Sequence, residues 1–185
     1  RTQKFSEYLS DYGWDPIVLT ATPNAYNKCD NTYEEPEHLS GKIHRAFSLN
    51  SARDLSVFGR YPRIFEYPDW YLSWYWQAMR KGKALVRRYQ PDVIWSTFPA
   101  STAHLIAGRL AKKFNLPWVA DFRDPLGSHY DEMANGNSFA SYIDKKTYEN
   151  ADHLVFVCEQ AANLYRKVYF DRPSISVIEN GFDDS

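Results

Sequence analysis

The chain is poor in cysteine, has no long apolar run and carries almost no net charge, and each shortage excludes a class of protein. Cys29 and Cys158 are the only cysteines among 185 residues and form no C-x-x-C pair, which gives neither a zinc signature nor a disulfide framework. No apolar stretch approaches the roughly 20 residues that span a bilayer, and no signal peptide is visible. The formal net charge of -1 provides no basic field for nucleic acid. We therefore expect a cytoplasmic protein that binds no nucleic acid and no metal ion.

The residues that are present indicate one folded domain. Apolar residues make up 44% and charged residues 24% of the sequence, as is typical of a soluble globular chain. A chain of 185 residues can bury a sizeable core. Aromatic residues are abundant at 17%. Trp and Tyr often line sugar-binding clefts, but they also serve as ordinary core and surface residues, and composition leaves both interpretations open.

Helical and strand patterns alternate along the chain. Most of the apolar segments are continuous, as expected of strands buried on both faces of a sheet. The predicted strands are residues 16–21, 92–96, 118–121, 153–158 and 176–179, and the predicted helices are 1–12, 69–89, 101–115, 139–150 and 159–169. This order predicts an α/β, Rossmann-like fold with a mostly parallel sheet and helices on both faces. Residues 24–67 are less regular, and we expect an insertion there with one strand near 46–49.

Two helix ends are marked by capping residues. Ser101 or Thr102 can cap the start of helix 101–115, and Asn115 with the following Pro117 ends it. Gly13 is expected to cap the first helix at its carboxyl end. An α/β domain usually opens with a strand, whereas this chain opens with a helical pattern. We therefore expect a first strand and its loop to precede residue 1.

The carboxyl ends of the predicted strands carry most of the polar candidates. In an open parallel sheet, ligands bind beyond these ends. The residues that we expect to line such a cleft are Thr97, Phe98, Asp121, Arg123, Asp124 and Glu159. The Asp121–Arg123–Asp124 segment stands out, because a guanidinium binds carboxylate or phosphate in a bidentate way and a carboxylate can orient a sugar hydroxyl. The alternative is a structural Asp–Arg pair that braces the loop before Pro125.

Five segments together resemble the N-terminal domain of family 4 glycosyltransferases. They are PDVIWST from Pro91, AHLIA from Ala103, LPWVADFRDP from Leu116, ADHLVFVCE from Ala151 and VIENGFD from Val177. The resemblance covers about half of the chain, from 91 to 183. It implies the N-terminal half of a GT-B fold, in which two Rossmann-like domains face each other across a cleft. Residues 1–185 would then be a single acceptor-side domain, and the C-terminal domain that binds the nucleotide-sugar would lie outside this chain.

The resemblance also implies how such a protein works. Family 4 enzymes generally retain the anomeric configuration and need neither a bound metal nor a cofactor. Asn180, Gly181 and Asp183 match the segment that borders the interdomain hinge. The family's E-x7-E pair and its glycine-rich turn are absent from this sequence, so we expect the isolated chain to be inactive. Thr97 and Arg123 stand near positions where relatives have histidines, and no catalytic residue is therefore assigned.

The expected function is sugar transfer from a nucleotide-sugar to a polysaccharide or lipid-linked acceptor. Half of a GT-B-like sugar-nucleotide epimerase, or a non-catalytic α/β binding module, are the alternatives. His104 is either a structural or surface histidine or a sugar contact. Five basic residues crowd helix 69–89, namely Arg80, Lys81, Lys83, Arg87 and Arg88. They form either a peripheral contact with the inner face of a membrane or an ordinary solvated helix face.

Overall fold

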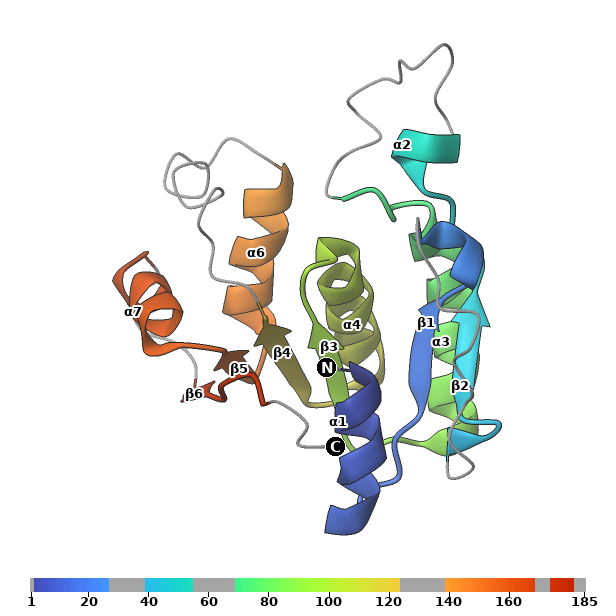
Figure 1. Cartoon of the computed structure of the whole chain (residues 1–185), viewed down its shortest axis with the longest axis horizontal. Helices are drawn as coiled ribbons and strands as arrows, with labels where there is room; N and C mark the ends of the chain where they lie inside the picture. The colour runs from blue at the N-terminus through green and yellow to red at the C-terminus, as the bar shows by residue number, and fades with distance from the viewer. Residues whose placement is uncertain (1, 27–38, 55–68, 124–138, 169–173, 182–185) are drawn as a thin grey trace. The chain divides into compact units, whose positions relative to one another are not determined.

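The computed structural model describes residues 2–26, 39–54, 69–123, 139–168 and 174–181 (Figure 1). The chain forms two compact units. Unit 1 comprises residues 1–66 with 70–84, and unit 2 comprises residues 67–69 with 85–185. The organisation of 1–185 as a single domain stays a prediction, and Asp124 and Asp183 lie outside the described residues.

Unit 1 is built around a two-stranded parallel sheet. Its elements are α1 (Thr2–Leu9), the 3-10 helix η1 (Ser10–Tyr12), β1 (Val18–Ala21), the 3-10 helix η2 (Pro23–Ala25), β2 (Ile43–Ala46), α2 (Ser51–Asp54) and most of α3 (Trp74–Tyr89). Gly13 closes η1 in a left-handed conformation with φ of 80°, and its N–H bonds to the Ser10 carbonyl oxygen. The predicted glycine cap is therefore confirmed.

The strand expected near residues 46–49 lies earlier in the chain. β2 ends at Ala46, which pairs with Ala21, the last residue of β1. One further bond follows, from the Thr22 N–H to the Ala46 carbonyl oxygen. Pro23 then turns the chain into η2, so β1 offers residues 47–49 no backbone partner. The prediction placed the strand too late because it ignored where its neighbour ends.

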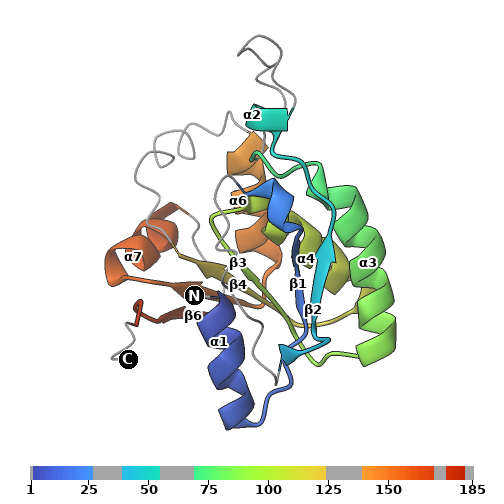
Figure 2. The same cartoon turned by 45° about the vertical axis from the view of Figure 1, so that its right-hand side comes forward.

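Unit 2 contains a four-stranded parallel sheet in the order β3-β4-β5-β6 (Figures 1 and 2). The strands are β3 (Ile94–Thr97), β4 (Trp118–Phe122), β5 (His153–Phe156) and β6 (Ser174–Val177). The helices are α4 (Ser101–Phe114), α6 (Phe139–Asn150) and α7 (Glu159–Val168). All three strand pairs are parallel. The predicted α/β fold with a parallel sheet is confirmed, and every predicted strand in this unit overlaps an observed one.

The two faces of this sheet differ in chemistry. One face carries Ala120, Phe122, Leu154 and Phe156 into a core that also includes Tyr165 of α7. Side chains of α4 and α6 complete the same core, so all three described helices of unit 2 pack on this face. The opposite face is more polar: in the row that crosses all four strands, Thr97, Asp121 and Ser176 are polar, and Val155 lies between Asp121 and Ser176. Apolar burial on both faces was expected, and this polar row departs from it.

Helix α4 begins differently from the prediction. Its N-cap residue is Ala100, which makes no side-chain cap bond, so the assignment of Ser101 or Thr102 as the cap is wrong. The carboxylate of Asp69 takes that role, because it accepts the Thr102 backbone N–H at 2.7 Å and the Thr102 hydroxyl at 3.0 Å. At the other end, Asn115 adopts a left-handed conformation with φ of 54°, as expected of a C-cap.

Helix α3 begins at Trp74, later than the predicted start at residue 69. The residues that it buries are Trp74, Tyr75, Ala78, Met79 and Gly82. Its other side therefore faces away from the core. Within the ranges that the structure describes, no helix has the length and apolar character needed to cross a membrane.

Candidate functional site

The ends of β3 and β4 bring three predicted cleft residues together. Thr97 is paired in register with Asp121. The Thr97 hydroxyl donates a hydrogen bond to Oδ2 of Asp121 at 2.8 Å, and the Phe98 N–H donates to the Asp121 carbonyl oxygen at 2.8 Å. Residues that are 24 positions apart in the sequence thus form one polar cluster at the carboxyl edge of the sheet.

Asp121 is buried, with only 1% of its surface exposed. Burying a carboxylate is costly unless hydrogen-bond donors face it, and the Thr97 hydroxyl is one such donor. With so little exposed surface, the contact of the carboxylate that the structure shows is internal, to Thr97. Because this bond joins the end of β3 to the end of β4, we interpret Asp121 as a positioning residue.

At the ends of β3 and β4, Arg123 is exposed, whereas Thr97 and Phe98 are half-buried. Phe98 is half-buried and stacks on Phe122 with ring centroids 6.4 Å apart. Arg123 is exposed, and no ion pair joins it to Asp121. The structural Asp–Arg pair considered as an alternative is therefore not formed between these two residues. An exposed guanidinium can bind hydroxyl, carboxylate or phosphate oxygens.

The remaining candidates follow β5 and β6 at the same edge. Glu159 opens α7, is exposed, and forms an ion pair with Arg166 at 2.8 Å. An acidic residue in the first turn also complements the helix dipole, which gives Glu159 a structural role. Asn180 and Gly181 are exposed beyond β6. Gly181 does not adopt the left-handed backbone conformation that only glycine favours.

Beneath this edge lies a buried polar network that the sequence-based list did not include. The Trp118 indole N–H donates to the Ser96 hydroxyl oxygen at 2.8 Å, and the same oxygen lies 2.8 Å from Nδ1 of His104. Because the indole can only donate, the Ser96 hydrogen is available to Nδ1. These two contacts join Ser96, Trp118 and His104 in one buried unit.

His104 is completely buried, and burial lowers its pKa to about 3. Its ring centroid lies 4.9 Å from that of Phe122 and 6.3 Å from that of Trp118. The structural interpretation of His104 is thus confirmed. The sequence contains a signal for this burial, because His104 shares one helix face with the small residues Ala107, Gly108 and Ala111. Small side chains on this face let Trp118 approach the helix.

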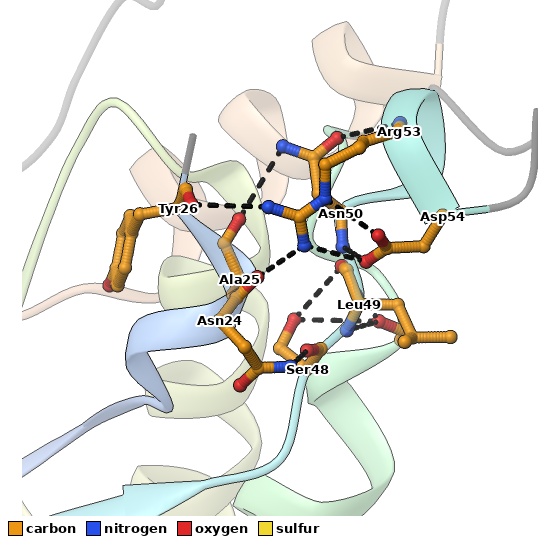
Figure 3. Close-up of polar contacts among 9 residues, drawn as sticks. Asn24, Ala25, Tyr26, Ser48, Leu49, Asn50, Arg53 and Asp54 are labelled. Carbon is orange, nitrogen blue, oxygen red and sulfur yellow. Dashed lines mark hydrogen bonds and ion pairs between the residues drawn. The ribbon is translucent and has the colours of Figure 1, made fainter. Parts of the chain in front are cut away.

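The corresponding edge of unit 1 carries a second polar cluster (Figure 3). The Arg53 guanidinium donates to the carbonyl oxygens of Asn24 and Tyr26 and to the Asp54 carboxylate. The Asn50 N–H donates to Oδ2 of Asp54 at 2.8 Å. These bonds, first from Arg53 and then from Asn50, hold the pKa of Asp54 below its usual value. The cluster ties the loop after β1 to the loop after β2, which is a structural role.

A groove of about 690 Å³ lies elsewhere in unit 2, between α4 and α6. Arg109, Lys112, Tyr142 and Lys146 are among its lining residues. It includes none of the predicted cleft residues. Among the residues described, no cluster of three or more His, Cys, Asp or Glu side chains could hold a metal ion.

Comparison with known proteins identifies the family. The model of the family described as "Glycosyl transferase 4-like domain" matches residues 1–181. The chain belongs to this family. The match covers almost the whole of the glycosyl transferase 4-like domain, including residues 1–90, whereas the sequence motifs covered about half of it. No curated protein matches the domain significantly.

Solved structures of sucrose-phosphate synthase from Thermosynechococcus elongatus share the fold of this glycosyl transferase 4-like domain. One has a TM-score of 0.65 and the other 0.59, and both are 16% identical and cover 97% of this chain. The domain spans 41% of the first of those chains and 83% of the second. At this identity the likeness shows the fold alone, and it confirms the predicted α/β architecture of the GT-B type.

Proposed function

We propose that the full-length protein transfers a sugar from a nucleotide-sugar to a polysaccharide or lipid-linked acceptor, and that this domain binds the acceptor. The observation that carries the proposal is the family match over residues 1–181. The same family supports transfer with retention of anomeric configuration and without a bound metal or cofactor. A cytoplasmic location is part of this proposal.

Two helix termini of unit 2, the starts of α4 and α7, support an acceptor role rather than a nucleotide-binding one. In nucleotide-binding α/β domains, the pyrophosphate binds at a helix N-terminus that follows a strand. The first turn of α4 already receives the Asp69 carboxylate, and the first turn of α7 contains Glu159. Both carboxylates repel phosphate. These two termini therefore favour a donor site on another part of the full-length protein.

In the proposed complex, the half-buried Phe98 and the exposed Arg123 contact the acceptor. Phe98 offers an apolar ring surface against which a sugar can stack, and Arg123 offers N–H donors for acceptor hydroxyl or phosphate oxygens. Asp121 and Thr97 keep the ends of β4 and β3 in the positions from which Phe98 and Arg123 project. Asn180 and Gly181 would lie close to the hinge with the second domain.

The test uses the purified full-length protein, a panel of nucleotide-sugars and glycan or lipid-linked acceptors. We expect release of nucleoside diphosphate only when an acceptor is present, and an anomeric configuration in the product that matches the donor, as read by NMR. Interconversion of a nucleotide-sugar without any acceptor would instead indicate the epimerase and contradict the proposal.

The isolated 185-residue chain provides the matched control. We expect it to release no nucleoside diphosphate under the conditions in which the full-length protein turns over. Turnover by the isolated chain would show that the donor binds within it, and would overturn the division of labour proposed here.

We also propose that the protein contacts the inner face of a membrane at its periphery, as suits a lipid-linked acceptor. The basic residues of α3 support this proposal, namely Arg80, Lys81, Lys83, Arg87 and Arg88.

A further inference from the structure

One stripe of α3 combines an exposed tryptophan with basic residues. Trp76, Arg80, Lys83 and Arg87 follow one another at positions i, i+4, i+7 and i+11, so they lie along one side of the helix. Trp76 is 78% exposed, although its ring meets that of Tyr75 edge-on at 5.2 Å. We call these four residues the Trp76 stripe.

The direction of the stripe follows from what the rest of the helix buries. Trp74, Ala78 and Gly82 are among the buried residues of α3 and lie on the other side. Arg80 and Arg87 are exposed and Lys83 is half-buried. A tryptophan that the core does not use is unusual, because its large ring normally contributes burial.

The five basic residues of the helix differ in the contacts that they make. Nζ of Lys81 donates to the carbonyl oxygen of Arg45, so Lys81 is engaged within unit 1. The guanidinium of Arg88 lies 5.1 Å from the centroid of the neighbouring Tyr89 ring. Both lie off the stripe. Arg87 stays exposed while its guanidinium lies over the Phe114 ring at 5.9 Å.

Charge determines which surface this stripe fits. From Trp70 to Pro91 the sequence contains five basic residues and no acidic residue, so no side chain of the helix offsets the positive charge. An exposed Trp favours the interface between water and lipid, and Lys or Arg side chains around it favour anionic headgroups. We propose that the Trp76 stripe docks on the surface of a bilayer that contains anionic phospholipid, with Trp76 at headgroup level and Arg80, Lys83 and Arg87 against the phosphates. The inference refines the membrane contact of the proposed function.

The test measures co-sedimentation of the full-length protein with two kinds of vesicle. One is pure phosphatidylcholine, and the other is an equal mixture of phosphatidylcholine and phosphatidylglycerol. We expect binding to the mixed vesicles only. Because each basic residue at such a surface contributes about fivefold to partitioning, the triple variant Arg80→Gln, Lys83→Gln, Arg87→Gln should weaken binding by about 100-fold.

Two control variants show whether binding requires the Trp76 stripe itself. One control tests the effect of net charge, and the other tests the effect of an exposed aromatic ring elsewhere. The triple variant Arg109→Gln, Lys112→Gln, Lys113→Gln removes the same charge from α4, and we expect it to retain most of the binding. Trp76→Ala should weaken binding, while Tyr142→Ala, which removes another exposed aromatic ring, should not. Unchanged thermal unfolding of each variant shows that binding, not folding, has changed.

Three outcomes would overturn the inference: no binding to the mixed vesicles, equal binding to both vesicle types, or equal losses in the α3 and α4 triple variants. A separate assay tests the proposed function: it measures transferase activity on a detergent-solubilised acceptor. We expect the stripe variants to retain this activity. Vesicle binding by a protein that shows no transferase activity would keep the docking surface and reject the proposed function.

Discussion

The buried His104 makes a specific prediction for how folding stability depends on pH. Burial lowers its pKa from 6.5 to about 3. The folded state therefore excludes a proton that the unfolded state binds once the pH falls below 6.5. The stability that depends on the neutral ring is fully present above pH 6.5 and is lost progressively as the pH falls toward 3.

The size of the effect follows from these two pKa values. At pH 7.5 His104 is neutral in both states and contributes almost nothing to the difference. At pH 5.0 the solution is about 1.5 pH units below the pKa of His104 in the unfolded state, so protonation stabilises the unfolded state. Each pH unit corresponds to about 1.4 kcal/mol. The free energy of unfolding should therefore fall by about 2 kcal/mol between pH 7.5 and 5.0 because of His104 alone.

The assay compares urea unfolding of the wild type and of His104→Gln at both pH values. Glutamine can still bond to Ser96 but does not titrate, and the other titratable groups cancel in the comparison. We expect the wild type to lose about 2 kcal/mol more than the variant on going from pH 7.5 to 5.0. Equal losses would refute the conclusion that His104 is buried and neutral in the folded protein.

Three further substitutions test the packing and the site. Asp69→Ala should lower the free energy of unfolding by about 2 kcal/mol, because the Thr102 N–H and hydroxyl lose their shared acceptor; an unchanged urea midpoint would show that Asp69 does not cap α4. Gly108→Ala should cost about 1–3 kcal/mol, since the new Cβ would lie 2.7 Å from Cζ3 of Trp118, and a wild-type Tm would contradict that close approach. Asp121→Asn in the full-length protein should lower kcat/KM by about tenfold or more with little change in Tm, whereas wild-type kinetics would remove Asp121 from the site.

Local patterns were sufficient to predict most of the fold. The apolar stripe of helix 101–115 and the apolar strands on either side of it predicted the parallel sheet of unit 2. This was possible because helical periodicity and the alternation of strands with helices depend on residues that are close in the sequence. Asn115 was also predicted as the residue that ends α4, since its αL conformation is a local preference. The cap provided by Asp69 could not be predicted in this way, because it joins residues 33 positions apart.

The site was only partly predictable for the same reason. The rule that ligands bind beyond the strand ends selected Thr97 and Asp121, and the structure joins them by a hydrogen bond. Burial of Asp121 was not predictable, because it depends on elements distant in sequence. The network of Ser96, His104 and Trp118 was missed because helical spacing shows which residues share a face, but not which polar atoms meet across the core.

The most direct test of the proposed acceptor site is a kinetic comparison of Arg123→Ala with Lys112→Ala in the full-length protein. Both changes remove one exposed positive charge, but only Arg123 lies at the carboxyl edge of the sheet. If this edge holds the acceptor, Arg123→Ala should raise the KM for the acceptor by about tenfold, leave the KM for the nucleotide-sugar unchanged, and keep the wild-type Tm. A KM for the acceptor that stays at the wild-type value, or rises equally in Lys112→Ala, would contradict the account.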